Sequence, residues 1–180
     1  TAGGSSGGTA AALAANLLPV ADGSDMMGSL RNPAAFNNVY GFRPTWGLVP
    51  NDADGDNFMQ TLATSGPMAR NPMDLARLLE TMVGPNPLVP VNLTPSDCYT
   101  SGLDKTVSNK RIAWIGDWNG YYQYEHGINE LCKDALTKYS KMGVEIEKFI
   151  PEFDPNLLWH SWLTLRSWSV SNGMRDLYKD

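Results

Sequence analysis

The feature that most constrains this chain is a pair of glycine-rich serine turns that flank an alanine-rich segment. Residues 1–8 read TAGGSSGG and place Ser5 and Ser6 between two glycine pairs. Residues 23–36 read GSDMMGSLRNPAAF and place Ser29 in a second turn. Glycines let the backbone approach a bound group closely, so turns of this kind can direct main-chain N–H groups at a developing oxyanion.

Other glycine and serine motifs fit these turns less well. No Lys follows the second glycine pair, which excludes a phosphate loop of the G-x-x-x-x-G-K-[ST] kind. Leu30 and Arg31 follow Ser29, which excludes the G-x-S-x-G elbow of the α/β-hydrolases. On composition alone, GGSSGG is also typical of a flexible linker. Between the turns, residues 9–18 (TAAALAANLL) are strong helix formers and predict a helix.

Taken together, the two stretches resemble the amidase signature family. That family carries GGSSGG, an Ala-rich helix and a D-x-G-G-S-[IL]-R-x-P-A turn, and this chain reads GGSSGG, TAAALAANLL and DMMGSLRNPA. Ser29 follows Ser5 by 24 positions (29 − 5), which is also the family's spacing. The resemblance continues through residues 40–50 (YGFRPTWGLVP) and 66–70 (GPMAR). It is strong over residues 1–84 and weaker to about residue 153.

The resemblance implies a catalytic pair of serines. Ser29 would be the nucleophile, and Ser5, which would follow a cis peptide bond from Gly4, would pass protons between Ser29 and a lysine. A serine hydroxyl is a poor nucleophile until a neighbour removes its proton, and a lysine does so only when its pKa falls towards neutrality. The implied reaction is hydrolysis of a carbon–nitrogen amide bond through an acyl-enzyme, with no cofactor and no metal.

Other residues of the two turns would support this chemistry. Ser6 would hydrogen-bond within its loop, and Asp25 and Arg31 would hold the second turn in shape, most simply as an ion pair. The main-chain oxyanion hole would be formed by Met26, Met27, Gly28 and Ser29. Met27 stands where the family has a glycine, so its side chain either shapes the substrate pocket or changes the oxyanion loop.

The general base that the resemblance requires does not occur in this sequence. The family's lysine lies upstream of GGSSGG, whereas this chain begins at Thr1 and carries its seven lysines from Lys105 onward. We therefore expect residues 1–180 to be an interior part of one amidase signature domain, truncated at both ends. It would be inactive alone and would require the rest of its own polypeptide.

Three alternatives remain open. His126 or His160 would be the base in a Ser-His-Asp esterase, because triads occur in several chain orders. Alternatively, the chain would be part of an A-type subunit of a glutamyl-tRNA amidotransferase, which would use the same core and pass ammonia to a partner. A non-catalytic homologue would act as a binding or scaffold protein.

Composition narrows the class of protein further. A hydrophobic share of 42% and a charged share of 18% are typical of a globular chain. A net charge of −5 without a basic stripe argues against nucleic-acid binding, and the apolar stretch 10–21 is too short to span a bilayer. Cys98 and Cys132 match no disulfide framework or zinc motif. We predict a cytoplasmic protein that acts on a small-molecule amide. The sequence is compatible with a homodimer.

The predicted fold class is α/β, with a mixed β-sheet flanked by helices. Residues 1–84 would form the signature core, 85–109 an extended connection, and 110–180 a strand–loop–helix–strand–helix segment. Residues 37–60 are predicted to be loop-rich, and residues 62–69 to break at Gly66-Pro67. Within that loop, DADGD at 52–56 favours a solvated turn over a calcium loop, because its glycine falls one position early.

Later in the chain, three helices and two strands are predicted. Asn71 would cap a helix over Pro72–Val83, and Asp154 would cap the last helix. Strands within 111–118 and 144–149 would be joined by a right-handed crossover through a helix over 127–142. That helix would bury one face, formed by Ile128, Leu131, Cys132, Ala135, Leu136 and Tyr139. The tyrosine-rich loop 119–125 would either wall an aromatic or apolar pocket or cover the sheet edge.

Overall fold

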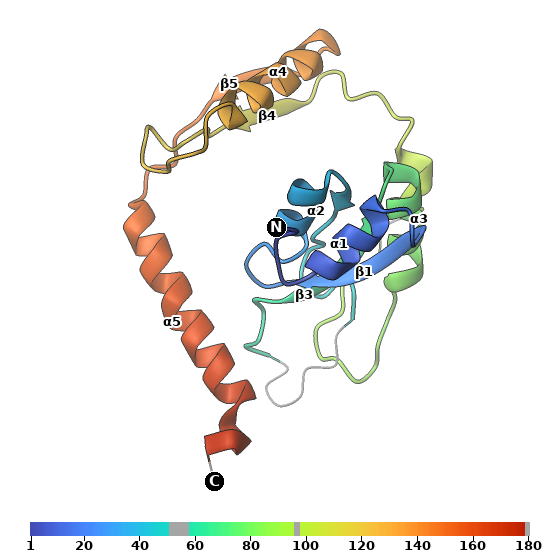
Figure 1. The fold of residues 1–180 in the computed structure, drawn as a ribbon, viewed down its shortest axis with the longest axis vertical. Coiled ribbons are helices and arrows are strands. Elements are labelled where there is room, and N and C mark those ends of the chain that lie inside the picture. The colour runs from blue at the N-terminus through green and yellow to red at the C-terminus, as the bar shows by residue number, and fades with distance from the viewer. Residues whose placement is uncertain (51–57, 96–97, 179–180) are drawn as a thin grey trace. The chain divides into compact units, whose positions relative to one another are not determined.

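The computed structural model describes residues 1–50, 58–95 and 98–178 (Figure 1). The DADGD stretch at 52–56 lies outside the described residues. The chain divides into two compact units, one formed by Thr1–Asp104 with the chain from Trp168 onward, and one by Lys105–Ser167. One boundary, after Asp104, falls inside residues 85–109, and the other, after Ser167, falls inside the last long helix. The predicted α/β class is confirmed, since both units combine strands with helices.

The first unit is built on a small antiparallel sheet. Its strands are β1 (Val20–Asp25), β2 (Tyr40–Gly41) and β3 (Thr64–Ala69), in the order β1-β3-β2. Strands β1 and β3 pair along their whole length, from Val20 opposite Ala69 to Asp25 opposite Thr64. Three α-helices lie wholly within the described residues of the unit: α1 (Gly7–Ala14), α2 (Arg31–Asn37) and α3 (Pro72–Met82).

The core of this unit lies directly beneath the Ser29 turn. It contains one fully buried residue of that turn, Leu30, and residues from α1, α2 and β3, namely Ala10, Leu13, Ala34 and Met68. Burial of a leucine side chain stabilises a fold by roughly 1.5–3 kcal/mol. The residue that follows Ser29 therefore anchors the turn in the hydrophobic core.

Helix α2 is absent from the sequence prediction, which describes the residues around Ser29 only as a turn. In the structure Pro33 occupies the third position of α2, within the first helical turn, where no intrahelical N–H donor is required. The prediction for α1 is also too long at its C-terminal end. Asn16 adopts a left-handed φ of 59° and Pro19 follows, so the helix ends at Ala14 and not at residue 18.

The predicted break at Gly66-Pro67 is wrong, because β3 continues through both residues. In an antiparallel strand, the N–H and C=O of one residue point to the same side. The Pro67 carbonyl accepts a hydrogen bond from the Phe42 N–H (3.1 Å), so the missing Pro67 donor faces the β2 side. Strand β2 has already ended at Gly41 there, and the ladder with β1 is unaffected.

The segment that follows β2 packs closely on β3. An ideal Cβ at Gly66 would lie 2.2 Å from the carbonyl oxygen of Phe42 and 2.7 Å from Cδ of Pro44. Pro44 is fully buried. The backbone on both sides of Arg43 is therefore held in place, by the Phe42–Pro67 hydrogen bond before it and by burial after it.

Helix α3 confirms its prediction. The Asn71 side chain accepts a hydrogen bond from the Asp74 N–H (2.9 Å), as expected of an N-cap, and Pro72 occupies the first helical position. Leu79 is buried, while Leu75, Leu78 and Met82 are half-buried. The predicted apolar face therefore turns towards the protein.

In the second unit, β4 (Arg111–Trp114) and β5 (Glu145–Lys148) pair in parallel, with α4 (Ile128–Lys141) between them in the chain. The predicted strand–helix–strand order is therefore confirmed. The predicted burial of α4 is wrong: none of its residues is buried, and Leu131 is 69% exposed. Two four-residue strands offer too little surface to cover a helix of fourteen residues.

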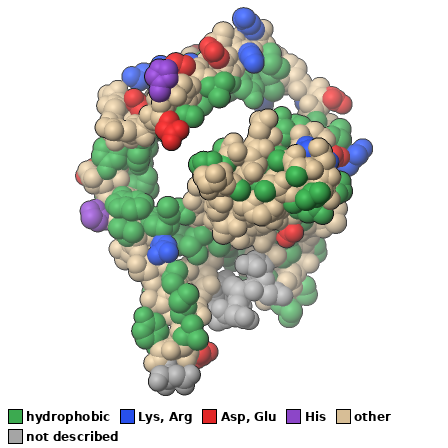
Figure 2. Space-filling model, in the orientation of Figure 1, with side chains coloured by type: hydrophobic (Ala, Val, Ile, Leu, Met, Phe, Trp, Pro, Cys, Tyr) green, Lys and Arg blue, Asp and Glu red, His purple; other side chains and the backbone are tan. Residues whose placement is uncertain are grey.

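Helix α5 (Pro155–Gly173) begins where the sequence predicts. Asp154 Oδ1 accepts a hydrogen bond from the Asn156 N–H (2.9 Å). Apolar side chains are exposed along this helix, as the green patches of Figure 2 show; they include Leu157, Leu158, Trp159, Leu163, Leu165 and Trp168. No helix that the structure describes is long and apolar enough to cross a membrane.

Candidate active site

The turn that carries Ser29 is organised by one buried carboxylate. Asp25 is the last residue of β1 and its side chain is fully buried. Its Oδ1 accepts a hydrogen bond from the Gly28 N–H (2.6 Å), and its Oδ2 accepts from the N–H groups of Leu30 (3.2 Å) and Arg31 (3.4 Å). These three bonds fold the chain between β1 and α2, which includes Ser29, around the carboxylate.

Two arginines neutralise this carboxylate. Arg31 binds both oxygens, with Nε 2.9 Å from Oδ2 and Nη2 3.1 Å from Oδ1 of Asp25, so the expected ion pair is present. Arg43 also contacts Asp25, with its Nε 3.5 Å from Oδ1. The sequence prediction assigns no role to Arg43, although a cation within the motif YGFRPTWGLVP was the signal that could have found it.

The groups that donate hydrogen bonds to the carboxylate decide the ionisation state of Asp25. Burial raises the pKa of this carboxyl, but hydrogen bonds from Arg31, Gly28 and Leu30 outweigh burial and lower the pKa from 3.8 to about 2. The hydrogen bond between Arg31 and Asp25 also raises the pKa of Arg31. Asp25 is therefore ionised at neutral pH and suits a structural role better than that of a general acid.

The first serine loop lies against the second. The Ser6 N–H donates to the Ser29 carbonyl (3.2 Å), and the Ser6 hydroxyl donates to the Ser24 carbonyl (3.5 Å). Ser6 therefore bonds to β1 and to the Ser29 turn, and not within its own loop as the resemblance implies. The Gly4–Ser5 peptide bond is cis, as the resemblance does imply. Ser5 is exposed and Ser29 is half-buried.

The main-chain donors near Ser29 are not equivalent. The Gly28 N–H is occupied by Asp25, whereas the N–H groups of Met26, Met27 and Ser29 donate to no other residue that the structure describes. Gly28 has a left-handed φ of 97°. Met27 does not adopt a positive φ and its side chain is 53% exposed, so the backbone at this position does not require the family's glycine.

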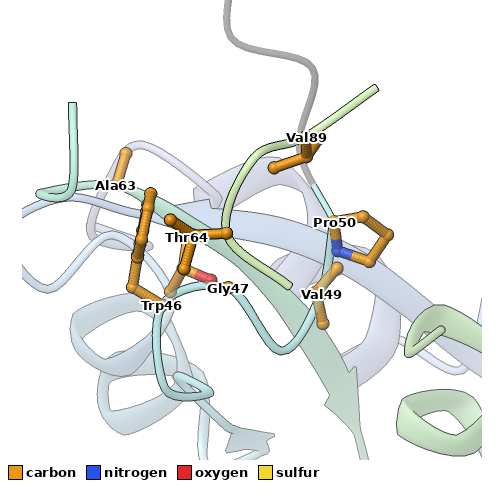
Figure 3. A pocket seen from close by; sticks show the side chains of 8 residues that line it. Trp46, Gly47, Val49, Pro50, Ala63, Thr64 and Val89 are labelled. Atoms are coloured by element: carbon orange, nitrogen blue, oxygen red, sulfur yellow. The ribbon is translucent and has the colours of Figure 1, made fainter. Parts of the chain in front are cut away.

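A small pocket elsewhere in the first unit lacks this organisation. It is lined by Thr64, the partner of Asp25 across the sheet, and by Trp46, Gly47, Val49, Pro50, Ala63, Val89 and Val91, none of them titratable (Figure 3). Within the described residues, no three His, Cys, Asp or Glu side chains are grouped as metal ligands would be.

The second unit does not bring the remaining candidates into a site. Two pockets there are lined by Trp114, Lys133 and Lys148 among others, and neither includes a residue of the tyrosine loop 119–125. In that loop Tyr121 and Tyr122 pack edge-to-face on each other (4.9 Å between ring centres). His126 and His160 are both exposed.

Comparisons with known proteins show the family to which the chain belongs. The Amidase family model matches residues 1–178. The chain is 36% identical over 146 residues to the A component of the glutamyl-tRNA(Gln) amidotransferase of Thermus thermophilus, covering 81% of the chain and 30% of that protein. It is 34% identical over 154 residues to an acylamidase of Rhodococcus erythropolis, covering 85% of the chain and 32% of that protein.

Solved structures show the same fold. A bacterial aryl acylamidase of the amidase signature family superposes with a TM-score of 0.90 at 29% identity, covering 99% of this chain and 37% of its own. The A component of the Thermotoga maritima glutamyl-tRNA(Gln) amidotransferase gives a TM-score of 0.80 at 26% identity, covering 97% and 38%. The fold and the paired serine loops define a member of the amidase signature class.

The chain belongs to the amidase family. It spans about a third of the length of the curated relatives that it matches.

Proposed function

We propose that this chain is the nucleophile-bearing part of an enzyme that hydrolyses a carbon–nitrogen amide bond through an acyl-enzyme on Ser29. A lysine outside residues 1–180 takes the Ser29 proton through the Ser5 hydroxyl, and Ser29 Oγ attacks the carbonyl carbon. The amine leaves with a proton, and water then hydrolyses the acyl ester, which frees the acid and restores the Ser29 hydroxyl.

The observation that carries this proposal is the contact between the two serine loops. The Ser6 N–H bond to the Ser29 carbonyl holds the segment that carries Ser5 against the proposed nucleophile. A proton relay needs such proximity, because proton transfer occurs only within hydrogen-bond reach. The two loops are brought together by a core and a sheet that belong to the same unit.

The proposed oxyanion hole follows from the distribution of main-chain donors. Asp25 holds the Gly28 N–H, which leaves the N–H groups of Met26, Met27 and Ser29 to stabilise the oxyanion. Loss of one such donor costs roughly 100- to 1000-fold in kcat in other acyl-transfer enzymes. The exposed Met27 side chain lies beside these donors in the sequence and would favour an apolar or aryl acyl group.

A second candidate function is that of the A component of an amidotransferase. Several relatives, including those of Thermus thermophilus and Nitrosomonas europaea, are named as such components of glutamyl-tRNA(Gln) amidotransferase. Ammonia would then leave as the same acyl-enzyme forms, and it would pass to a partner protein. Dependence of the activity on that partner distinguishes this candidate from a free-standing amidase.

The test is fluorophosphonate labelling of the full-length polypeptide that contains this chain, read by intact mass and peptide mapping. We expect one adduct, on Ser29, and loss of both adduct and amide hydrolysis in Ser29→Ala, by on the order of 10⁴-fold or more in kcat. Ser108→Ala is the matched control, because Ser108 is a serine of the second unit whose hydroxyl accepts a hydrogen bond from Thr106, far from Ser29 in the chain. A full-length chain that takes no label would favour the scaffold alternative.

A further inference from the structure

The contacts of Arg43 differ from those of Arg31 in a way that the ion pair alone does not explain. Arg31 is 56% exposed and makes two short contacts with the Asp25 carboxylate. Arg43 is only 29% exposed, and its Nε contacts with Asp25 are longer, at 3.5 Å to Oδ1 and 3.4 Å to the main-chain oxygen. Its shortest hydrogen bond runs from Nη2 to the Leu62 carbonyl (2.9 Å).

These contacts join three separate segments of the first unit. Arg43 itself follows β2, Asp25 ends β1, and Leu62 lies two residues before β3 begins. The backbone that carries Arg43 is fixed on both sides, by the Phe42 N–H bond to Pro67 and by the buried Pro44. The guanidinium therefore links the end of β1, where the Ser29 turn starts, to the segment that leads into β3, and the backbone beside Arg43 is itself bonded to β3.

Arg43 is not required to keep Asp25 ionised. Arg31 and three main-chain N–H groups already bind both oxygens of the carboxylate. Without Arg43 the carboxylate would remain paired, but the turn would lose its side-chain link to the sheet. A reacting group that is misplaced by about 1 Å loses on the order of 100-fold in rate, even when the cause lies away from the chemistry.

We infer that Arg43 is a positioning residue for Ser29, which acts through Asp25 to fix the nucleophile turn against the sheet. This inference rests on the proposed function of Ser29. It assigns to Arg43 no contact with substrate.

The test compares Arg43→Gln and Arg43→Lys with the parent in the full-length polypeptide. Arg77→Gln is the matched control, because Arg77 is an exposed arginine of the same unit that pairs only loosely with Asp74 (3.6 Å). Three quantities are measured: the fraction of Ser29 that a fluorophosphonate finally labels, the rate constant of labelling, and kcat and KM for an anilide substrate.

We expect Arg43→Gln to label completely but about 10- to 100-fold more slowly, with kcat lowered by a similar factor and KM within about twofold. Arg43→Lys should recover part of the rate, because the ammonium keeps the charge but cannot reach Asp25 and Leu62 together. Arg77→Gln should match the parent. A merely structural role would instead lower the fraction labelled and leave the rate for each labelled site unchanged.

Other outcomes overturn the inference. If Arg43→Gln has the labelling rate and the kcat of the parent, Arg43 is not a positioning residue. The adduct on Ser29 would in that case leave the proposed function intact. A parent that is labelled elsewhere, or not at all, would overturn both. If Arg43→Gln does not fold, Arg43→Lys decides: a slower rate at an unchanged melting temperature supports the inference, and a parental rate overturns it.

Discussion

The two units of this chain contain strands and helices of similar kinds but bury them very differently. In the unit of Ser29, Ala10, Leu13, Leu30 and Met68 are fully buried and form a core at the base of the turn that carries Ser29. In the unit of residues 105–167, Val144 is the one buried residue among those described. Local sequence signals are thus sufficient to form elements in both units, whereas a packed interior depends on contacts between distant segments.

The largest effect is expected when one leucine in each unit is replaced by alanine. Leu30→Ala should lower the free energy of unfolding by about 3 kcal/mol, within the range of roughly 2–5 kcal/mol for buried leucines, because it leaves a cavity under the Ser29 turn. Leu131→Ala, on the exposed face of α4, should change it by less than about 0.5 kcal/mol. Urea unfolding checks both; equal losses would mean that α4 is covered in the whole protein.

The second test uses pH and the buried carboxylate of the first unit. The pKa of Asp25 is lowered from 3.8 to about 2, so its stabilising contribution is complete above about pH 4 and is lost as the pH falls towards 2. We expect the parent to exceed Asp25→Asn in stability by about 2 kcal/mol more at pH 6 than at pH 2. Urea titrations at several pH values measure this difference. A gap that is constant with pH would contradict the lowered pKa.

The third test asks whether removal of a helix cap has the same cost in stability in both units. Asn71 caps α3 in the first unit and Asp154 caps α5 at its start in the second. Each alanine substitution should cost about 1 kcal/mol, because a cap acts on the first turn of its own helix. Peptide-resolved hydrogen exchange reads the two helix starts separately. A much larger cost at one cap would show that it also supports tertiary packing.

The smallest effect is expected at the surface ion pair of the parallel strands. Arg111 Nη2 lies 2.7 Å from Glu147 Oε1, but the two side chains are 65% and 45% exposed. Glu147→Gln should therefore lower the free energy of unfolding by less than about 0.5 kcal/mol and should have still less effect in high salt. Urea unfolding at two salt concentrations measures it, and a cost above about 1 kcal/mol would contradict the exposure of the pair.

The sequence predicts those parts whose signals lie close together in the chain. The Asn71-Pro72 start of α3, the Asp154 cap and the β4–α4–β5 order all depend on neighbouring residues, and all are confirmed. The path of β3 through Pro67 could not be predicted in this way, because it depends on where β2 ends.

The same limit applies to the candidate site. The Asp25–Arg31 pair spans six positions within one motif and was expected. The contact of Arg43 with Asp25 crosses 18 positions and exists only because the sheet brings β1 and the end of β2 together. Which N–H donors of the turn remain free likewise depends on how the buried carboxylate is oriented, and sequence spacing does not reveal that.

Gly66 extends the sequence requirement of the site to a residue without a side chain. A methyl group there would collide with the Phe42 carbonyl and with Pro44, the two neighbours of Arg43. Gly66→Ala would push that segment off the sheet and carry the guanidinium away from Asp25. We therefore expect a mutational scan of this protein to find that Gly66 tolerates substitution as poorly as a catalytic residue does. Gly66 nevertheless lies in the middle of a strand and has no side chain that could contact a substrate.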